Sequence, residues 1–151
     1  MIVIFSFSAK PAPESNDISL SVGMQIGQTF VPEFETWSVQ EQEAFAEAIN
    51  HPVRKCAHAL EYAVLGFLLS GTIIASKTSV DSPGRRVFYM RQAFLAFAIA
   101  VAYAVSDEIH QLFVPGRAGM LKDVLIDSSG AIVGVVVFSL MVLEKRDRNV
   151  G

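Results

Sequence analysis

Residues 87–105 read "VFYMRQAFLAFAIAVAYAV", and this stretch decides the fold class. It is apolar almost throughout, and it is followed at once by "SDEIHQ", residues 106–111. A helix needs about 20 mostly apolar residues to cross the hydrocarbon core of a membrane. The stretch is therefore predicted to be a membrane span. The acidic residues and the histidine that follow it must be solvated, paired with opposite charges or used in the protein's function, because charge in a membrane is costly.

Two further stretches have the same character. They are "CAHALEYAVLGFLLSGTIIA", residues 56–75, and "VLIDSSGAIVGVVVFSLMVL", residues 124–143. All three are apolar nearly all round, unlike the one-sided stripe of a soluble amphipathic helix. A soluble chain of 151 residues could hardly bury three such helices completely. The predicted fold class is all-α: a polytopic α-helical membrane bundle of three full spans plus a short or truncated N-terminal helix, forming one membrane domain over residues 1–151.

The N-terminal part is expected to differ from these spans. Residues 1–9, "MIVIFSFSA", would form a helix of about 14 Å, only half a bilayer. They are interpreted as a partial first span whose true start lies upstream, or as a re-entrant or interfacial piece. Residues 10–54 are predicted to form an outer acidic region with two short interfacial helices. The second begins with a capping box, Ser38 followed by Glu41, and Pro52 is predicted at the start of the first spanning helix.

Composition excludes some classes of function. The chain is 52% hydrophobic and only 18% charged, against about a quarter charged in ordinary soluble proteins. Its net charge is -3 and no basic stripe is present, so no nucleic-acid partner is expected. Cys56 is the single cysteine, which excludes an internal disulfide. Its apolar surroundings favour a small buried side chain.

Basic residues predict the orientation of the spans. Short cytoplasmic loops carry an excess of lysine and arginine. The connection after residues 56–75 and the C-terminal tail hold such residues: Lys77, Arg85, Arg86, Lys145, Arg146 and Arg148. The chain is therefore expected to be a multi-pass protein of the cell membrane with a cytoplasmic C-terminus. The acidic region and the loop "GRAGMLKD", residues 116–123, would then lie on the outer face.

Ionisable residues gather at this predicted outer surface. "RKCAHALEY", residues 54–62, places three of them at spacings of four and three, on one face of a helix. "SDEIHQ" and "GRAGMLKDVLID", residues 116–127, supply the rest. The candidates for catalysis are His58, Glu61, Asp107, His110, Asp123 and Asp127. The candidates for anion binding are Arg54 and Arg117, and the supporting residues are Tyr62, Glu108 and Gln111.

Three kinds of chemistry fit these residue types. Histidines and carboxylates together bind a divalent metal or act as a base and its orienting partner, and arginines hold an anionic headgroup. The metal candidates are His58, Glu61, His110 and Asp123, although their spacing matches no known di-iron or zinc-protease motif. The alternative is an inert network in which the arginines neutralise the acids. Gly130 and Gly134 are expected to allow close helix packing.

The three motifs resemble one family. In order they read "RKxxHxxEY", "SDExHQxFVPGR" and "DVxxDxxG", and they resemble the VanZ-like membrane proteins over nearly the whole chain. The family pattern falls on Arg54, Lys55, His58, Glu61, Tyr62, Asp107, Glu108, His110, Gln111, Pro115, Gly116, Arg117, Asp123, Asp127 and Gly130. The departure is the shortened first helix. The resemblance implies a role in the cell envelope, with reduced susceptibility to glycopeptides such as teicoplanin, and it implies no established reaction.

Three hypotheses for the function follow. In the first, an outward-facing polar pocket binds or modifies an anionic lipid-linked envelope molecule and lowers teicoplanin susceptibility. In the second, the chain is a membrane-embedded hydrolase or transferase, with or without a divalent metal, acting on a lipid-linked precursor. In the third, it is a structural membrane scaffold. The expected partner is a membrane lipid or a lipid-linked cell-wall precursor. Enzymatic activity, substrate and oligomeric state stay open at this point.

Overall fold

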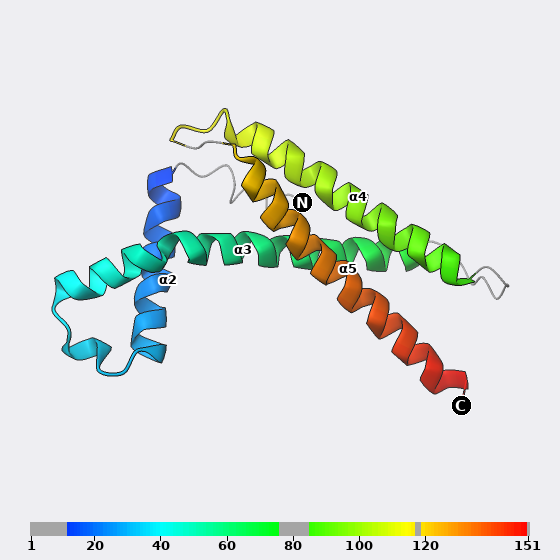
Figure 1. Cartoon of the computed structure of the whole chain (residues 1–151), viewed down its shortest axis with the longest axis horizontal. Coiled ribbons are helices and arrows are strands. Elements are labelled where there is room, and N and C mark those ends of the chain that lie inside the picture. Colours follow the sequence, from blue (N-terminus) through cyan, green and yellow to red (C-terminus); the bar gives the residue numbers. More distant parts are fainter. Residues whose placement is uncertain (1–11, 76–84, 117–118, 151) are drawn as a thin grey trace. The chain divides into compact units, whose positions relative to one another are not determined.

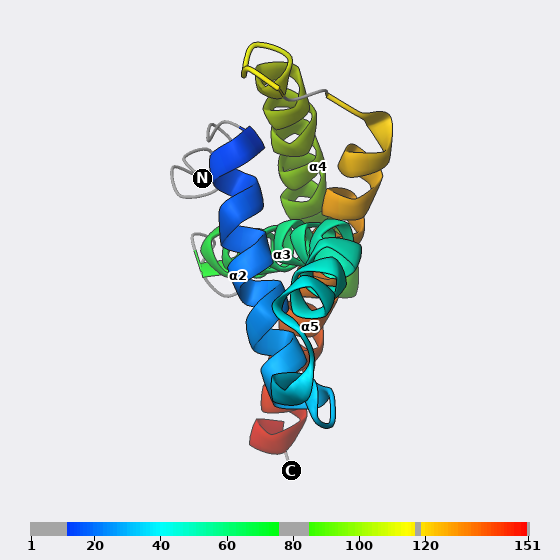
Figure 2. The ribbon, with the colours of Figure 1, turned by 90° about the vertical axis from the view of Figure 1, so that its left-hand side faces the viewer.

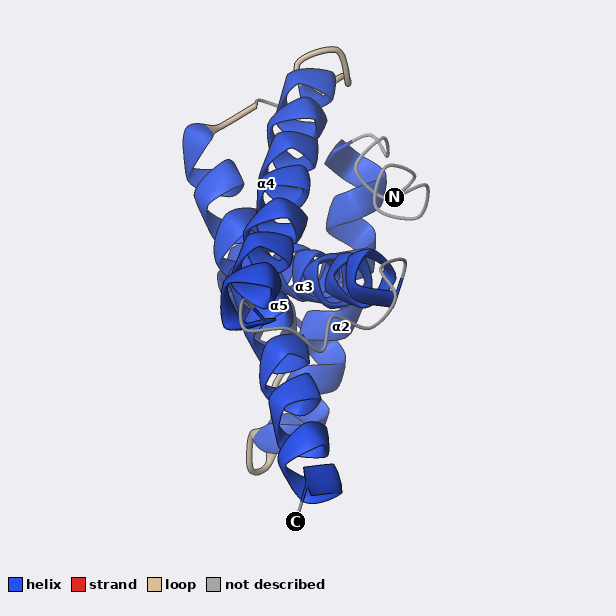
Figure 3. Cartoon of the chain, turned by 90° about the vertical axis from the view of Figure 1, so that its right-hand side faces the viewer, coloured by secondary structure: helices blue, strands red, loops and turns tan. Residues whose placement is uncertain are grey.

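The computed structural model describes residues 12–75, 85–116 and 119–150, and these are helical apart from short turns. The elements are α2 (Ala12–Phe30), the 3-10 helix η1 (Phe34–Thr36), α3 (Val39–Ala75), α4 (Arg85–Gln111) and α5 (Leu121–Val150) (Figure 1). The described ranges contain no strand (Figure 3). The predicted all-α class is confirmed. The predicted partial first span, residues 1–9, lies outside the described residues.

Three of these helices are long and apolar enough to cross a membrane. Among the described residues, the candidate spans are Val39–Ile74, Val87–Gln111 and Leu121–Glu144. The helices α3, α4 and α5 that carry them contain the stretches predicted from the sequence, residues 56–75, 87–105 and 124–143. The expectation of three full spans is therefore confirmed by helix length and composition.

Residue sizes are distributed as expected for a membrane protein. Small residues fill the interior, and Ala96 and Ala100 of α4 are completely buried. Large apolar residues face outward, and Leu60, Val64 and Leu68 of α3 are each more than half exposed. A soluble protein would expose few such residues together, because contiguous apolar surface is costly in water. In lipid the arrangement is favourable, since small residues let helices approach closely.

The chain divides into two compact units. The first comprises Met1–Ala57 and Ile109–Gly119, and the second comprises His58–Glu108 and Met120–Gly151. The helices α3 and α4 each contribute residues to both units. The described part of each unit has its own internal packing.

In the first unit, α2 packs on the beginning of α3 through small residues (Figure 2). A Cβ atom on Gly23 would lie 3.2 Å from Ala46 of α3, so little space separates the two helices there. The ring of Phe34 lies against Phe45, with the ring centroids 5.4 Å apart. By contrast, Ile18 and Val22 of α2 are each 43% exposed, so they do not lie on the face that packs against α3.

The start of α3 follows the prediction, but its course does not. The backbone N–H of Ser38 donates to Glu41 Oε2 at 2.8 Å, and the Glu41 N–H donates to Ser38 Oγ at 3.4 Å. This confirms the capping box. The helix then continues through Pro52 to Ala75, so the predicted helix start at Pro52 is wrong. A proline removes only one backbone donor, and surrounding good helix formers carry the helix past it.

In the second unit, the backbones of α3 and α5 are in direct contact. A Cβ atom on Gly130 would overlap the carbonyl oxygen of Ala59, and one on Gly134 would overlap that of Ala63. Gly66 of α3 has the same role toward α5, where an added Cβ would lie 2.5 Å from a backbone oxygen. The predicted role of the two α5 glycines in close helix packing is confirmed.

This contact predicts the effect of the smallest possible substitution. Gly134→Ala should destabilise the protein by about 1–3 kcal/mol, because a backbone carbonyl cannot rotate out of the way as a side chain can. The matched control is Val133→Ala, at a position that is 56% exposed and should change stability by about 0.5 kcal/mol or less. Thermal unfolding of both detergent-solubilised variants measures the difference. An unfolding midpoint for Gly134→Ala equal to that of the wild type would contradict the contact.

Candidate functional site

Tyr62 lies at the centre of the polar residues of the second unit. It projects from α3 and is 0% exposed. Its hydroxyl interacts electrostatically with Asp107 and Glu108 of α4, with Asp127 of α5, and with Tyr103. The rings of the two tyrosines lie with their centroids 6.2 Å apart. Helices α4 and α5 therefore bring acidic groups to one buried tyrosine of α3.

Glu61 belongs to the same group. It is half-buried, and it interacts electrostatically with Asp107 across the α3–α4 boundary. Asp107 and Asp127 are each 1% exposed. We call these residues the acid–tyrosine cluster: Glu61, Tyr62, Tyr103, Asp107, Glu108 and Asp127. Carboxylates packed together in a low-dielectric interior must be neutralised by protons, cations or cationic groups.

The buried atoms of the cluster without a hydrogen bond include one on Tyr62 and one on Glu61. Within the described ranges, the Tyr62 hydroxyl and Glu61 Oε2 have no hydrogen-bond partner. Each buried group left unpaired costs about 1–3 kcal/mol. Polar groups inside a membrane span are rare, and where they occur they mark functional positions. The cluster is therefore unfavourable for stability and favours a role in binding or chemistry.

Glu108 holds the end of α4 to the beginning of α5. Its Oε2 accepts a hydrogen bond from the backbone N–H of Met120 at 2.7 Å. Met120 directly precedes α5, so the carboxylate lies at the N-terminus of that helix, where negative charge is favourable. Glu108 was predicted as a supporting residue, and this contact makes it a residue that positions α4 and α5.

The remaining predicted residues are placed as follows. In the second unit, His58 of α3 and Asp123 of α5 are half-buried. In the first unit, Arg54 and His110 are half-buried, and Gln111 is buried. Arg117 lies outside the described residues. The structure thus brings together the acids of α3, α4 and α5 around Tyr62, whereas convergence with the arginines and with His110 stays a prediction.

The described residues do not fit a metal site. Among residues 12–75, 85–116 and 119–150, no three His, Cys, Asp or Glu side chains are placed to hold a metal ion. The sequence had offered His58, Glu61, His110 and Asp123 as ligands. The carboxylates of the cluster interact electrostatically, but they are not arranged as the ligands of a divalent cation are.

The comparison with protein families covers the whole cluster. The VanZ/LLP1 family matches residues 1–142. The chain belongs to the VanZ/LLP1 family. The match confirms the resemblance carried by the three motifs, and it includes every candidate residue from Arg54 to Asp127. No curated protein and no solved structure gives a significant match to the sequence.

Some features of this VanZ/LLP1 protein were missed from its sequence. Ser70 of α3 is 0% exposed and Gln92 of α4 is 6% exposed, so two further polar side chains lie inside the spans. A signal existed for Gln92, because it continues the four-residue spacing of the buried alanines of α4. The prediction that Cys56 is buried was wrong, since its side chain is exposed. The preference of cysteine for the interior applies to proteins in water, where outward positions are not apolar.

The unpaired hydroxyl of Tyr62 gives a testable prediction. Tyr62→Phe keeps the ring and removes a buried donor that has no partner in the described structure. We expect the thermal unfolding midpoint to stay unchanged or to rise, because loss of such a group is neutral or stabilising. Tyr62→Ala is the contrasting variant, and loss of the buried ring should cost about 3–5 kcal/mol. Destabilisation by Tyr62→Phe close to that of Tyr62→Ala would mean that the hydroxyl is bonded.

Proposed function

We propose that the acid–tyrosine cluster binds the polar headgroup of an anionic lipid-linked envelope molecule. The observation that carries the proposal is the fully buried Tyr62, whose hydroxyl lies among carboxylates from α4 and α5. Such groups are costly inside a membrane bundle that needs only packing. A ligand that donates hydrogen bonds or carries a cationic group would offset this cost.

The chemistry of the residues narrows the ligand. Hydroxyl and amino groups of a sugar headgroup would donate to the carboxylates of Glu61, Asp107 and Asp127. A glycosylated polyprenyl phosphate carries such groups on its sugar. Membership of the VanZ/LLP1 family supports an envelope role.

The orientation of the chain determines which molecules reach the cluster. The basic residues between α3 and α4, and those after α5, favour a cytoplasmic location for these segments. The cluster lies at the opposite ends of the same helices, so it would face the outer surface. Lipid-linked cell-wall precursors are displayed there, and glycopeptides such as teicoplanin bind there. The proposed consequence is lowered susceptibility to teicoplanin.

The same cluster would also suit a membrane-embedded hydrolase or transferase. The specific observation in its favour is the burial of Asp107 and Asp127 beside Tyr62, since buried carboxylates and phenols serve as proton donors and acceptors. His58 would act as the base in this alternative. Turnover of the bound lipid would distinguish the enzyme from the binding protein.

The proposal predicts a loss of function without a loss of protein. His58→Ala and Glu61→Ala should each reduce the teicoplanin resistance of an expressing host to that of the host alone, and should weaken binding of a polyprenyl phosphate by about tenfold or more, about 1.4 kcal/mol. Membrane abundance should stay near that of the wild type. The matched control is Leu60→Ala, which changes a residue between them that is 67% exposed and should leave both properties unchanged.

The outcomes separate the three hypotheses. Loss of resistance in parallel with loss of protein would support a structural scaffold, because an unpaired buried charge costs about 3–5 kcal/mol. Normal binding and resistance in both variants would contradict the proposed headgroup site. Release of inorganic phosphate or transfer of the sugar by the purified wild type would establish the enzyme.

A further inference from the structure

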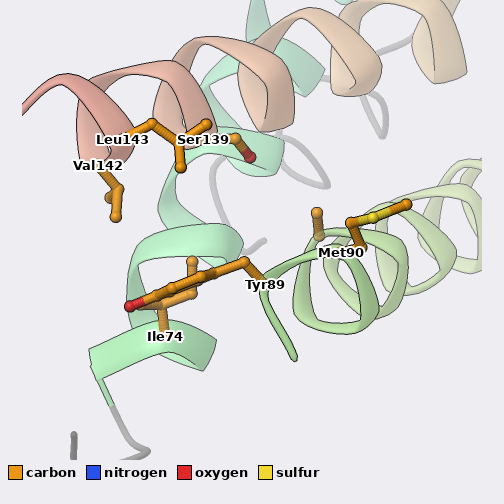
Figure 4. Close-up of a pocket in the computed structure, with 7 residues that line it drawn as sticks. Ile74, Tyr89, Met90, Ser139, Val142 and Leu143 are labelled. Atoms are coloured by element: carbon orange, nitrogen blue, oxygen red, sulfur yellow. The ribbon is translucent and has the colours of Figure 1, made fainter. Parts of the chain in front are cut away.

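A second site lies at the opposite end of the second unit from the acid–tyrosine cluster. There the ends of α3 and α5 and the beginning of α4 enclose a pocket, lined by Ile74, Tyr89, Met90, Ser139, Val142 and Leu143 (Figure 4). Ala93 completes the lining. We call this the acyl pocket. The proposed function does not use it.

The packing of α3 against α5 explains why a pocket forms here. The glycine contacts bring the two helices together near Gly66 and Gly134. Further along, the ring of Phe138 occupies the interface, 5.1 Å from the ring of Phe67 between centroids, and it lies against Gly71. Beyond Phe138 come the residues that line the pocket. Because the large side chains of Phe67 and Phe138 lie between the helices at this end, the two backbones cannot stay in contact.

The lining is apolar and lies within the membrane spans. Every lining residue falls inside one of the three candidate spans. The hydroxyl of Ser139 donates to the carbonyl oxygen of Val135 at 2.7 Å, so it is satisfied within its own helix. The medium around the pocket is therefore hydrocarbon, and the molecules that reach it in quantity are lipid acyl chains.

The volume limits what the pocket holds. It is about 160 Å³. An apolar cavity of roughly 150 Å³ stays dry and binds molecules the size of benzene, whereas sites for whole small molecules begin at roughly 300 Å³. The acyl pocket therefore fits several methylene groups of a chain, and it is too small for a lipid headgroup.

Charge at the same helix ends indicates the kind of lipid. Arg85 and Arg86 open α4, and Arg91, between two lining residues of α4, is exposed. On α5, the sequence after the last lining residue, Leu143, is "EKRDRNV", with three basic and two acidic residues. Basic residues at the membrane surface attract anionic headgroups. A phosphate held at this surface would place the upper part of its acyl chain at the depth of the pocket.

We propose that the acyl pocket holds part of one acyl chain of an anionic phospholipid, whose headgroup lies at the basic ends of α4 and α5. The ligand is a membrane lipid rather than the envelope molecule of the proposed function. The two sites lie at opposite ends of the spans, so either proposal can fail without the other.

Filling the pocket tests the proposal. Ala93→Phe places a ring in the acyl pocket, and Ala102→Phe makes the same change at an exposed position of α4. Binding of phosphatidylglycerol to the purified full chain is measured by native mass spectrometry, with phosphatidylcholine as the neutral comparison. For Ala93→Phe we expect the dissociation constant of phosphatidylglycerol to rise by about tenfold, the effect of losing about two buried methylene groups. For Ala102→Phe it should equal that of the wild type.

Several results would overturn the proposal. They are equal binding of phosphatidylglycerol by the two variants, equal affinity of the wild type for the neutral lipid, and a change of oligomeric state in Ala93→Phe without a change in lipid binding. The last would make the pocket a contact between two copies of the chain. Val142→Phe is the second filling variant should Ala93→Phe not fold, and Leu140→Phe, at a position 60% exposed, is its control.

A measurement on the wild type completes the test. Phosphatidylglycerol with a photoactivatable group on the upper part of its acyl chain is incorporated with the full chain into vesicles. After irradiation, adducts should concentrate on Met90 and Val142 of the lining. Adducts spread equally over other outward residues of the same helices, such as Phe94, which is 71% exposed, would overturn the proposal.

Discussion

The backbone contact between α3 and α5 is the constraint on which the second unit depends. The carbonyl oxygens of Ala59 and Ala63 occupy the space that side chains on Gly130 and Gly134 would need. Tyr62 lies between those two alanines on α3, and Asp127 lies one turn before Gly130 on α5. The contact therefore sets the register of α3 against α5 that brings Tyr62 beside Asp127. The two glycines thus position the acid–tyrosine cluster as well as the helices. At the other end of the same interface, Phe138 lies between the helices, and the acyl pocket forms beyond it.

The hydrocarbon core of the membrane explains both the acid–tyrosine cluster at one end of the second unit and the acyl pocket at the other. In hydrocarbon, apolar burial gives helices little reason to associate, so close packing of small residues and buried polar contacts hold them together. A cluster of carboxylates and tyrosines is a poor choice for stability alone, because unpaired polar atoms are costly there. The VanZ/LLP1 chain nevertheless places Tyr62, Asp107 and Asp127 in its interior. The unpaired hydroxyl of Tyr62 supports selection for a ligand at one end, while the apolar pocket at the other end suits a lipid tail.

Patterns that depend only on local sequence were read correctly. Apolar runs predicted the three spans, the Ser38–Glu41 pair predicted the start of α3, and glycine spacing predicted close packing.

Predictions that depend on the neighbouring residues of the folded chain failed. Pro52 was taken as a helix start, although a long helix with good helix formers on both sides accommodates it. Spacing placed acids at one end of each helix, but it could not select which side chains turn inward, because that depends on the rotation of each helix about its axis. The burial of Gln92 was missed although it continues the four-residue spacing of the buried alanines of α4.

The account depends most directly on the proximity of acidic side chains from α3 and α4. With Cys56 replaced by alanine and a protease site placed between α3 and α4, the pair Glu61→Cys with Asp107→Cys is treated with a short thiol cross-linker in membranes and then cleaved. The account predicts that the two fragments stay joined. The control pair, Glu61→Cys with Ala93→Cys, moves the second thiol about 21 Å along α4, at about 1.5 Å per residue, and should separate. Fragments that separate for the test pair, or join equally for both pairs, would contradict the shared cluster.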